Sequence, residues 1–245
     1  MSGDRTGVVV QIRLGSTRLP AKALLPLGGA TLADMVLARL YLVPAELHIL
    51  ATDEESASAL GAVAERRHFE LFVGPADDVL ARYCQCARRF SLDRIIRATG
   101  DNPLISHELA SMLLARSVGQ EADYMTFAGL PVGMGVELVL TEALFRAEAE
   151  ARAPAEREHV CPYLYGHPEL FIVEREPAPR EFRFPQARVT VDTRADYEAM
   201  LKIYGALYSG SPISTASVIS YLKKESLLSD DVPRSDRPGN GGGAR

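Results

Sequence analysis

The sequence predicts an α/β fold, doubly wound around a mostly parallel sheet. In the first half of the chain, short apolar runs rich in β-branched residues alternate with segments of helical periodicity. Such alternation implies parallel strands joined by right-handed crossovers. In addition, the first apolar run, residues 8–12, stops abruptly at a polar, basic loop over residues 13–22. A buried parallel strand that ends in this way places its loop at the sheet edge where open α/β folds bind ligands.

Each element of the first half has its own signal. Thr31 is a capping residue for a helix, and Thr52-Asp53 is a helix-start signal. Val79, Leu80 and Tyr83 recur at helical spacing in a third segment. The expected strands are residues 8–12, 47–51, 71–73 and 94–98, and the expected helices are residues 32–40, 54–67 and 77–90.

The second half is less regular. A Gly/Pro-rich loop separates two apolar runs, and a further apolar run precedes Asp192. The expected strands are residues 124–127, 137–140 and 171–175, and the apolar run before Asp192 is residues 188–191. The expected helices are residues 141–151, 156–165, 195–208 and 217–224. No repeat or linker divides this body, so one domain is expected over residues 1–228. Residues 229–245 are polar and rich in glycine, and we predict a disordered tail there.

Composition excludes several classes of protein. The 245 residues are 47% hydrophobic, which suits one α/β domain. A net charge of −5 argues against a nucleic-acid or membrane-surface binder. The N-terminus, MSGDRTG, lacks the apolar region of a signal peptide, and no run is long enough to span a membrane, so a cytoplasmic location is expected. The three cysteines, Cys84, Cys86 and Cys161, fit a reducing compartment and show no metal or redox spacing.

The basic loop after the first strand is the most informative segment. Gly15 lets the backbone approach an anion closely, and Arg13, Arg18 and Lys22 can neutralise a polyphosphate. The loop is neither a Walker A sequence nor a G-x-G-x-x-G turn. The plain alternative is a solvated basic loop, because arginine and lysine are common on surfaces.

Two aspartates follow apolar runs and are expected near that loop. Asp101 comes after the run at 94–98, in T-G-D-N-P, and Asp192 comes after the run at 188–191. Mg²⁺ is typically held by one or two carboxylates together with phosphate oxygens and waters. Two strand-end aspartates opposite a basic loop therefore form a plausible metal–triphosphate site. Each also has a structural alternative, a turn for Asp101 and a helix cap for Asp192.

These motifs together resemble the spore-coat-polysaccharide-type cytidylyltransferases, relatives of the acylneuraminate and KDO cytidylyltransferases. The family loop Q-A-R-x-G-S-T-R-L-P-x-K stands here at residues 11–22, with Ile12 where a small residue is usual. The family patterns T-G-D-x-P and V-D-T-x-x-D-Y/F stand at residues 99–103 and 191–197. The resemblance covers about residues 8–208. It implies a fold like that of the nucleotide-diphosphosugar transferases, with a small antiparallel arm at roughly 124–187 for the second substrate and for dimerisation.

The resemblance also implies roles for particular residues. Asp101 and Asp192 would hold Mg²⁺ and, with Arg13 and Lys22, form the catalytic group. The implied nucleotide-binding residues are Gln11, Arg13, Gly15, Ser16, Arg18, Lys22, Asp77 and Arg97, and the implied acceptor-binding residues are Glu137, Arg157 and His159. Asp77 equally suits the start of a helix, Arg97 an ion pair, and His159 a structural role.

The implied reaction is Mg²⁺-dependent transfer of a nucleoside monophosphate to a sugar or sugar acid, with release of pyrophosphate, for surface polysaccharide or glycan biosynthesis. CTP is the favoured triphosphate and a homodimer the expected assembly; the base and the acceptor stay open. Gly135 departs from the family pattern P-x-G-x-D-V-E, which has aspartate there, although Glu137 is kept. A glycosyltransferase and a non-catalytic nucleotide-sugar-binding protein remain alternatives. The basic loop suits a triphosphate better than a diphosphate-sugar. The joint presence of Arg13, Lys22, Asp101 and Asp192 argues against a family member that has lost catalytic activity.

Overall fold

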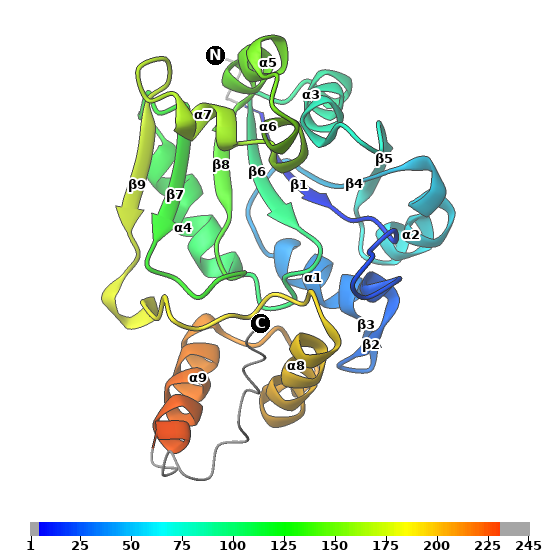
Figure 1. Ribbon diagram of the computed structural model, residues 1–245, viewed down its shortest axis with the longest axis vertical. Helices are drawn as coiled ribbons and strands as arrows, with labels where there is room; N and C mark the ends of the chain where they lie inside the picture. The colour runs from blue at the N-terminus through cyan, green and yellow to red at the C-terminus, as the bar shows by residue number, and fades with distance from the viewer. Residues whose placement is uncertain (1–4, 231–245) are drawn as a thin grey trace, which may run out of the picture.

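The protein is built around a seven-stranded sheet with the order β5-β4-β1-β6-β8-β7-β9 (Figure 1). The structure is a computed structural model that describes residues 5–230. The four strands that the first half of the chain contributes to this sheet are all parallel to one another. They are β1 (Thr6–Gln11), β4 (Leu47–Thr52), β5 (Glu70–Val73) and β6 (Arg94–Thr99). The doubly wound α/β fold expected from the sequence is confirmed.

Antiparallel pairing occurs in two places. Strand β8 (Glu137–Leu140) runs antiparallel to both β6 and β7 (Tyr124–Ala128), and β9 (Val173–Pro177) closes that edge parallel to β7. A separate two-stranded antiparallel sheet, β2 (Pro26–Leu27) with β3 (Ala30–Thr31), follows the 3-10 helix η1 (Lys22–Leu24). The segment 124–187 thus contributes three neighbouring strands to the main sheet.

Helices cover both faces of the sheet. Because successive side chains of a strand point to opposite faces, Val8 and Val10 of β1 belong to one hydrophobic core and Val9 to another. The first core also takes side chains from α1, α2, α4, α8 and α9, and the second from α3, α5 and α7. These helices are α1 (Leu32–Leu40), α2 (Glu54–Arg66), α3 (Val79–Phe90), α4 (His107–Ser117), α5 (Thr141–Glu150), α7 (Pro162–Gly166), α8 (Arg194–Leu207) and α9 (Thr215–Asp230). Within residues 5–230, every helix is too short or too polar to cross a membrane.

Several helix starts follow the capping residues in the sequence. Thr31 and Asp34 form a reciprocal capping box at α1, and the Asp53 side chain accepts from Ser56 N–H at the start of α2. Asp78 caps α3 in the same way, so this helix begins at Val79 rather than at the predicted residue 77. Figure 1 shows α8 and α9 at the end of the molecule toward which β6 and β7 point.

The structure corrects three sequence-based expectations. The helix predicted over 156–165 is two short ones, α6 (Pro154–His159) and α7, because the chain turns at Val160, whose φ is 73°. Helix α4 was not predicted. The run 188–191 forms no strand in the described chain, only an isolated bridge between Arg188 and Val132, so the expectation of a strand-end Asp192 is wrong. Residues 231–245 of the predicted tail lie outside the described residues.

Candidate active site

Strands β1 and β6 are neighbours that end together. Gln11 is in register with Thr99, and Gly100 N–H donates to the Gln11 carbonyl over 2.9 Å. The basic loop leaves from β1 and Asp101 leaves from β6, and their side chains border a first cavity of about 410 Å³. The candidate site therefore lies at the carboxyl edge of the parallel strands, as the sequence predicted.

Most of the predicted site residues meet at this first cavity. Those that line it are Gln11, Arg13, Gly15, Ser16, Arg18, Lys22, Arg97, Asp101, His159 and Asp192. Glu137 borders a neighbouring second cavity. Asp77 and Arg157 line neither cavity.

Lys22 joins the two aspartates that the sequence singled out. Its Nζ lies 3.1 Å from Asp101 Oδ2 and 3.1 Å from Asp192 Oδ1, and it donates to the Val191 carbonyl over 2.6 Å. Asp192 reaches this position without a strand, because Val191 N–H donates to the Asp101 carbonyl over 2.8 Å. This backbone hydrogen bond between two loops brings the two carboxylates to the same cation, and Asp192 N–H also donates to Asp196 Oδ2 over 3.0 Å.

Asp192 contacts two further cations. Arg18 Nη2 lies 3.1 Å from Asp192 Oδ1, and Arg188 pairs with Asp192 Oδ2. Together with Lys22, three cations face the carboxylates of Asp101 and Asp192, so the cluster carries excess positive charge that suits a polyanion. The sequence reasoning missed Arg188, although its place four residues before Asp192 was a usable signal once Asp192 was suspected.

The donor set at Asp101 and Asp192 fits Mg²⁺. No group of three or more His, Cys, Asp or Glu side chains within residues 5–230 could hold a metal ion by itself. Mg²⁺ needs no such cage when a nucleotide is present, because it is bound by one or two carboxylates plus substrate phosphates. The Lys22 ammonium group between the two carboxylates shows that the site stabilises a cation at that point.

Arg82 is a second residue that the sequence reasoning missed. It is only 1% exposed, lines the first cavity, and donates from Nε and Nη2 to the Pro75 carbonyl over 2.9 and 2.6 Å. Its Nη2 also donates to the Ala76 carbonyl over 2.9 Å. Burial lowers the pKa of Arg82. Its position next to Tyr83, in an amphipathic helix, was the signal in the sequence that could have identified Arg82 as a buried arginine.

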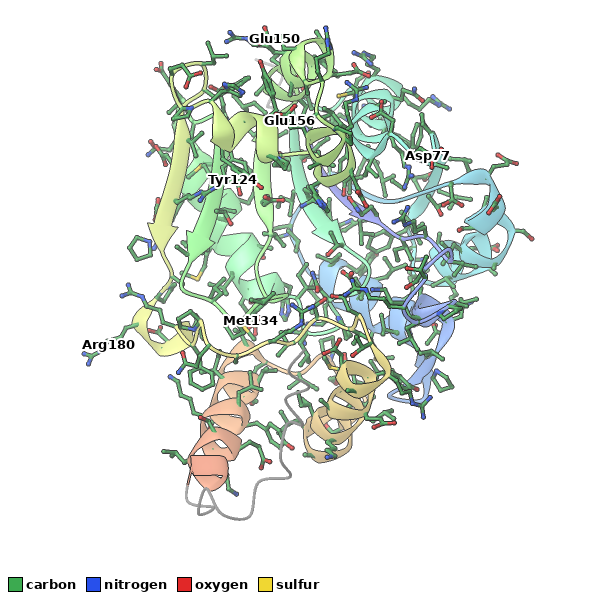
Figure 2. All side chains as sticks on the ribbon, viewed as in Figure 1. Asp77, Tyr124, Met134, Glu150, Glu156 and Arg180 are labelled. Atoms are coloured by element: carbon green, nitrogen blue, oxygen red, sulfur yellow. The ribbon has the colours of Figure 1, made fainter. Side chains whose placement is uncertain are left out.

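The two aspartates that precede α3 differ in their contacts, because Asp78 caps the helix and Asp77 does not. Asp77 is exposed, and Figure 2 shows it near α3 and β5. Asp78 accepts from Ala81 N–H over 2.9 Å and pairs with Arg157, whose Nη1 donates to the Glu148 carbonyl over 2.7 Å. Arg157 therefore connects α6 to α3 and α5 outside the cavity.

Arg97 links the two cavities, because it lines both. The second cavity has a volume of about 320 Å³ and lies against β7 and β8. Arg97 is ion-paired with Glu137, and the Tyr124 hydroxyl donates to Glu137 Oε1 over 2.8 Å. Burial lowers the pKa of Arg97, but the negative charge of Glu137 outweighs it, so the net pKa is raised. Figure 2 labels Tyr124 among the strands that border this cavity.

Comparison with known proteins agrees with this geometry. The sequence pattern of the family described as cytidylyltransferase matches residues 8–224. The spore coat polysaccharide biosynthesis protein SpsF of Bacillus subtilis (strain 168) is 33% identical over 223 residues, which are 88% of this chain and 93% of that protein.

Solved structures resemble the fold closely. A cytidylyltransferase from Leptospira borgpetersenii serovar Hardjo-bovis (strain JB197) has a TM-score of 0.85 at 27% identity, over 94% of this chain and 98% of that one. A CMP:2-keto-3-deoxy-manno-octonic acid synthetase complexed with CTP has a TM-score of 0.64 at 17% identity, over 83% of this chain and 99% of that one, and supports the fold alone. The family pattern spans most of the chain, including every residue that lines the first cavity. The chain therefore belongs to the cytidylyltransferase family, whose members are nucleotidyltransferases.

Proposed function

We propose that this protein transfers CMP from CTP to an oxygen of a sugar or sugar acid and releases pyrophosphate. The observation that carries the proposal is the Lys22–Asp101–Asp192 cluster beneath a basic loop at the sheet edge. Membership of the cytidylyltransferase family supports CTP as the nucleotide, and the similarity to a spore coat polysaccharide biosynthesis protein supports a role in surface polysaccharide synthesis.

The cations of the first cavity suit the triphosphate. Arg13, Arg18 and Lys22 lie on one loop around the cavity, where they can hold the β- and γ-phosphates and stabilise the pyrophosphate as it leaves. In the reaction, the acceptor oxygen forms a bond to the α-phosphorus while the bond from that phosphorus to the bridging oxygen breaks. Catalysis then consists mainly of alignment and charge neutralisation.

Asp101 and Asp192 are the proposed ligands of Mg²⁺. When bound, the ion would polarise the α-phosphate and help to orient the acceptor oxygen. With those carboxylates on the ion, the ammonium group of Lys22 would be available to the phosphates. The contact of Lys22 with both aspartates shows that all three side chains reach the same point of the cavity.

The second cavity is the proposed position of the acceptor. It adjoins the first through Arg97 and Thr99, so a sugar bound there lies beside the nucleotide. Glu137 lines this second cavity. His159 lines the first cavity instead, so we propose that it contacts the nucleotide rather than the acceptor. The homodimer and the cytoplasmic location stay predictions.

A pyrophosphate-release assay tests the proposal. The full chain with Mg²⁺ is offered CTP, GTP, ATP and UTP in turn, each with a panel of sugars, sugar phosphates and sugar acids. Release that requires CTP and one acceptor class, and that Asp192→Asn abolishes, is the expected result. A parallel reaction offers nucleotide-sugars in place of the triphosphates, and release of the nucleotide there, with no pyrophosphate from any triphosphate, would instead show a glycosyltransferase.

A further inference from the structure

The two proposed metal ligands differ in what holds their backbone. Asp101 follows directly from β6, whereas within the described chain the run before Asp192 takes part only in an isolated bridge. A carboxylate that binds a metal has to be held to within about 0.5 Å of its productive position, and residues in strands and helices are held more precisely than residues in loops. Asp192 therefore needs contacts that fix its backbone, in addition to the cations that face its side chain.

One carboxylate oxygen supplies such a contact. Asp196 Oδ2 accepts from the Asp192 N–H over 3.0 Å, from the Thr193 N–H over 2.8 Å and from the Thr193 hydroxyl over 2.9 Å. The bonds with Thr193 belong to the capping box of α8, in which the third residue of the helix binds back to the capping residue. The bond from Asp192 reaches one residue beyond that box and restrains the direction in which the Asp192 side chain leaves the backbone.

The capping box of α1 has the same chemistry but a different extension. Asp34 Oδ2 accepts from the Thr31 N–H over 3.1 Å and from the Thr31 hydroxyl over 2.6 Å. The further partners of Asp34 are Arg66 and Arg67 at the end of α2. The remaining acceptor capacity thus joins two helices at α1, whereas at α8 it holds the backbone of Asp192.

Helix α8 is itself anchored beside the rest of the cluster. Tyr197 and Tyr204 are buried in the first core. The Tyr197 hydroxyl donates to the Pro26 carbonyl, and the Tyr204 hydroxyl donates to the Pro103 carbonyl over 2.7 Å. The first carbonyl lies shortly after the basic loop, and the second lies shortly after the end of β6. A residue fixed to the start of α8 is therefore fixed relative to both of those segments.

Asp196 reaches the site through Asp192. Among residues 5–230, the side chains that line the two cavities include Asp192 but not Asp196. We propose that Asp196 is a positioning residue, which ties the backbone of Asp192 to α8 and so presents the Asp192 carboxylate to the metal and to the nucleotide. This inference rests on the proposed function, in which Asp192 is a ligand of Mg²⁺.

Calorimetry with a metal as probe tests the inference. The full chain is titrated with a non-hydrolysable CTP analogue, once with saturating Mn²⁺ and once with EDTA. The ratio of the two affinities measures how much the metal tightens binding of the nucleotide. Asp196→Ala removes the acceptor from the Asp192 N–H, and we expect it to lower this ratio by about tenfold or more, as loss of a group that orients a metal ligand does.

Two matched variants separate positioning from charge and from helix capping. Asp196→Asn keeps an acceptor oxygen without the charge and should keep a ratio close to the native one. Thr193→Val removes the capping hydroxyl, which lowers thermal stability, but leaves the bond between Asp192 and Asp196, so it should also keep that ratio. A ratio lowered by either variant as much as by Asp196→Ala overturns the inference, and so does a native ratio in Asp196→Ala.

Folding of each variant is checked by circular dichroism, and the titrations are run well below the lowest unfolding temperature. If Asp196→Ala does not fold, Asp196→Ser takes its place with the same expectation, because the serine oxygen lies one bond nearer to its own backbone and farther from the Asp192 N–H.

The native chain and Asp192→Asn separate this inference from the proposed function. If Mn²⁺ does not tighten binding of the analogue to the native chain, or if Asp192→Asn leaves the ratio unchanged, the proposed metal site fails and the inference fails with it. If both behave as expected but Asp196→Ala keeps the native ratio, only the inference about Asp196 fails.

Discussion

At the scale of single residues, the two aspartates are held by different means. Asp101 follows directly from β6, a buried strand, whereas Asp192 depends on a loop that one backbone hydrogen bond attaches to the Asp101 carbonyl. Ile12 shows a similar dependence. It is 3% exposed, and a Cβ at Gly100 would lie 2.4 Å from its Cγ1, so this bulky residue fits its loop only because residue 100 is glycine.

Asparagine at either aspartate should abolish most activity without unfolding the protein. Asp101→Asn and Asp192→Asn keep the size of the side chain but replace a carboxylate with an amide, a poor Mg²⁺ ligand. We expect a loss of about 100-fold or more in kcat/KM for CTP turnover with unchanged thermal unfolding. The control is Glu70→Gln, the same chemical change at an exposed residue of β5. Near-normal turnover in both aspartate variants would disprove the metal site.

Loss of a cation from the basic loop should weaken binding of the triphosphate and leave binding of the nucleoside unchanged. Lys22→Ala and Arg18→Ala remove charge-assisted contacts, each of which contributes about 1.5–3 kcal/mol. Calorimetry should therefore show CTP binding weakened by about tenfold or more, with little change for cytidine. Lys202→Ala, at an exposed position on α8, is the control. Equal losses for CTP and cytidine would instead place these side chains at the base.

At the scale of elements, a buried carboxylate joins α1 to α2. Asp34 is 1% exposed, completes the capping box of α1, and accepts from Arg66 and Arg67 of the α2 end, each over 2.8 Å. Burial acts to raise the pKa of Asp34, but the hydrogen bonds from Arg66, Thr31 and Arg67 outweigh it and hold this pKa well below its ordinary value. The ion pairs thus contribute to docking of the two helices.

Asp34→Asn should destabilise the protein in a pH-dependent way. Because the folded-state pKa is depressed, the stabilisation from Asp34 is present above the unfolded-state pKa of about 4 and is lost as the pH falls through the folded value. We expect a deficit of about 1–3 kcal/mol at pH 7 that shrinks below about pH 4. Urea unfolding of the variant and of Glu65→Gln, an exposed control on α2, measures it. A deficit that grows on acidification would contradict the assignment.

Sequence predicted the elements where periodicity and capping agree. The run 8–12 and the capping residues Thr31 and Asp53 correspond closely to β1, α1 and α2. The run 188–191 misled because Val189 and Val191 are buried by tertiary packing in an extended loop, and apolarity alone does not distinguish this from a strand. The break at Val160 depends on a positive φ at a β-branched residue, which no local pattern predicts.

At the scale of the whole molecule, the sequence predicted which residues belong to the site but not which of them contact one another. Motifs identified Lys22, Asp101 and Asp192, but their mutual contacts, and the coupling of Arg97 to Glu137 between two cavities, depend on the sheet order. Arg157 shows the reverse case. Its motif suggested substrate, whereas the fold gives it a carboxylate partner at the start of α3. The single domain over residues 1–228 stays a prediction.

The distances along the chain between the members of the cluster have a consequence for how activity is acquired during folding. Lys22 is separated from Asp101 by 79 residues and from Asp192 by 170. Closing such large loops costs entropy before any contact compensates, so pairing across the whole chain is expected late in folding. Refolding after dilution from denaturant should therefore restore far-ultraviolet circular dichroism before it restores CTP turnover. During synthesis, a nascent chain would hold β1 and β6 but remain catalytically silent until the segment bearing Asp192 has left the ribosome and docked.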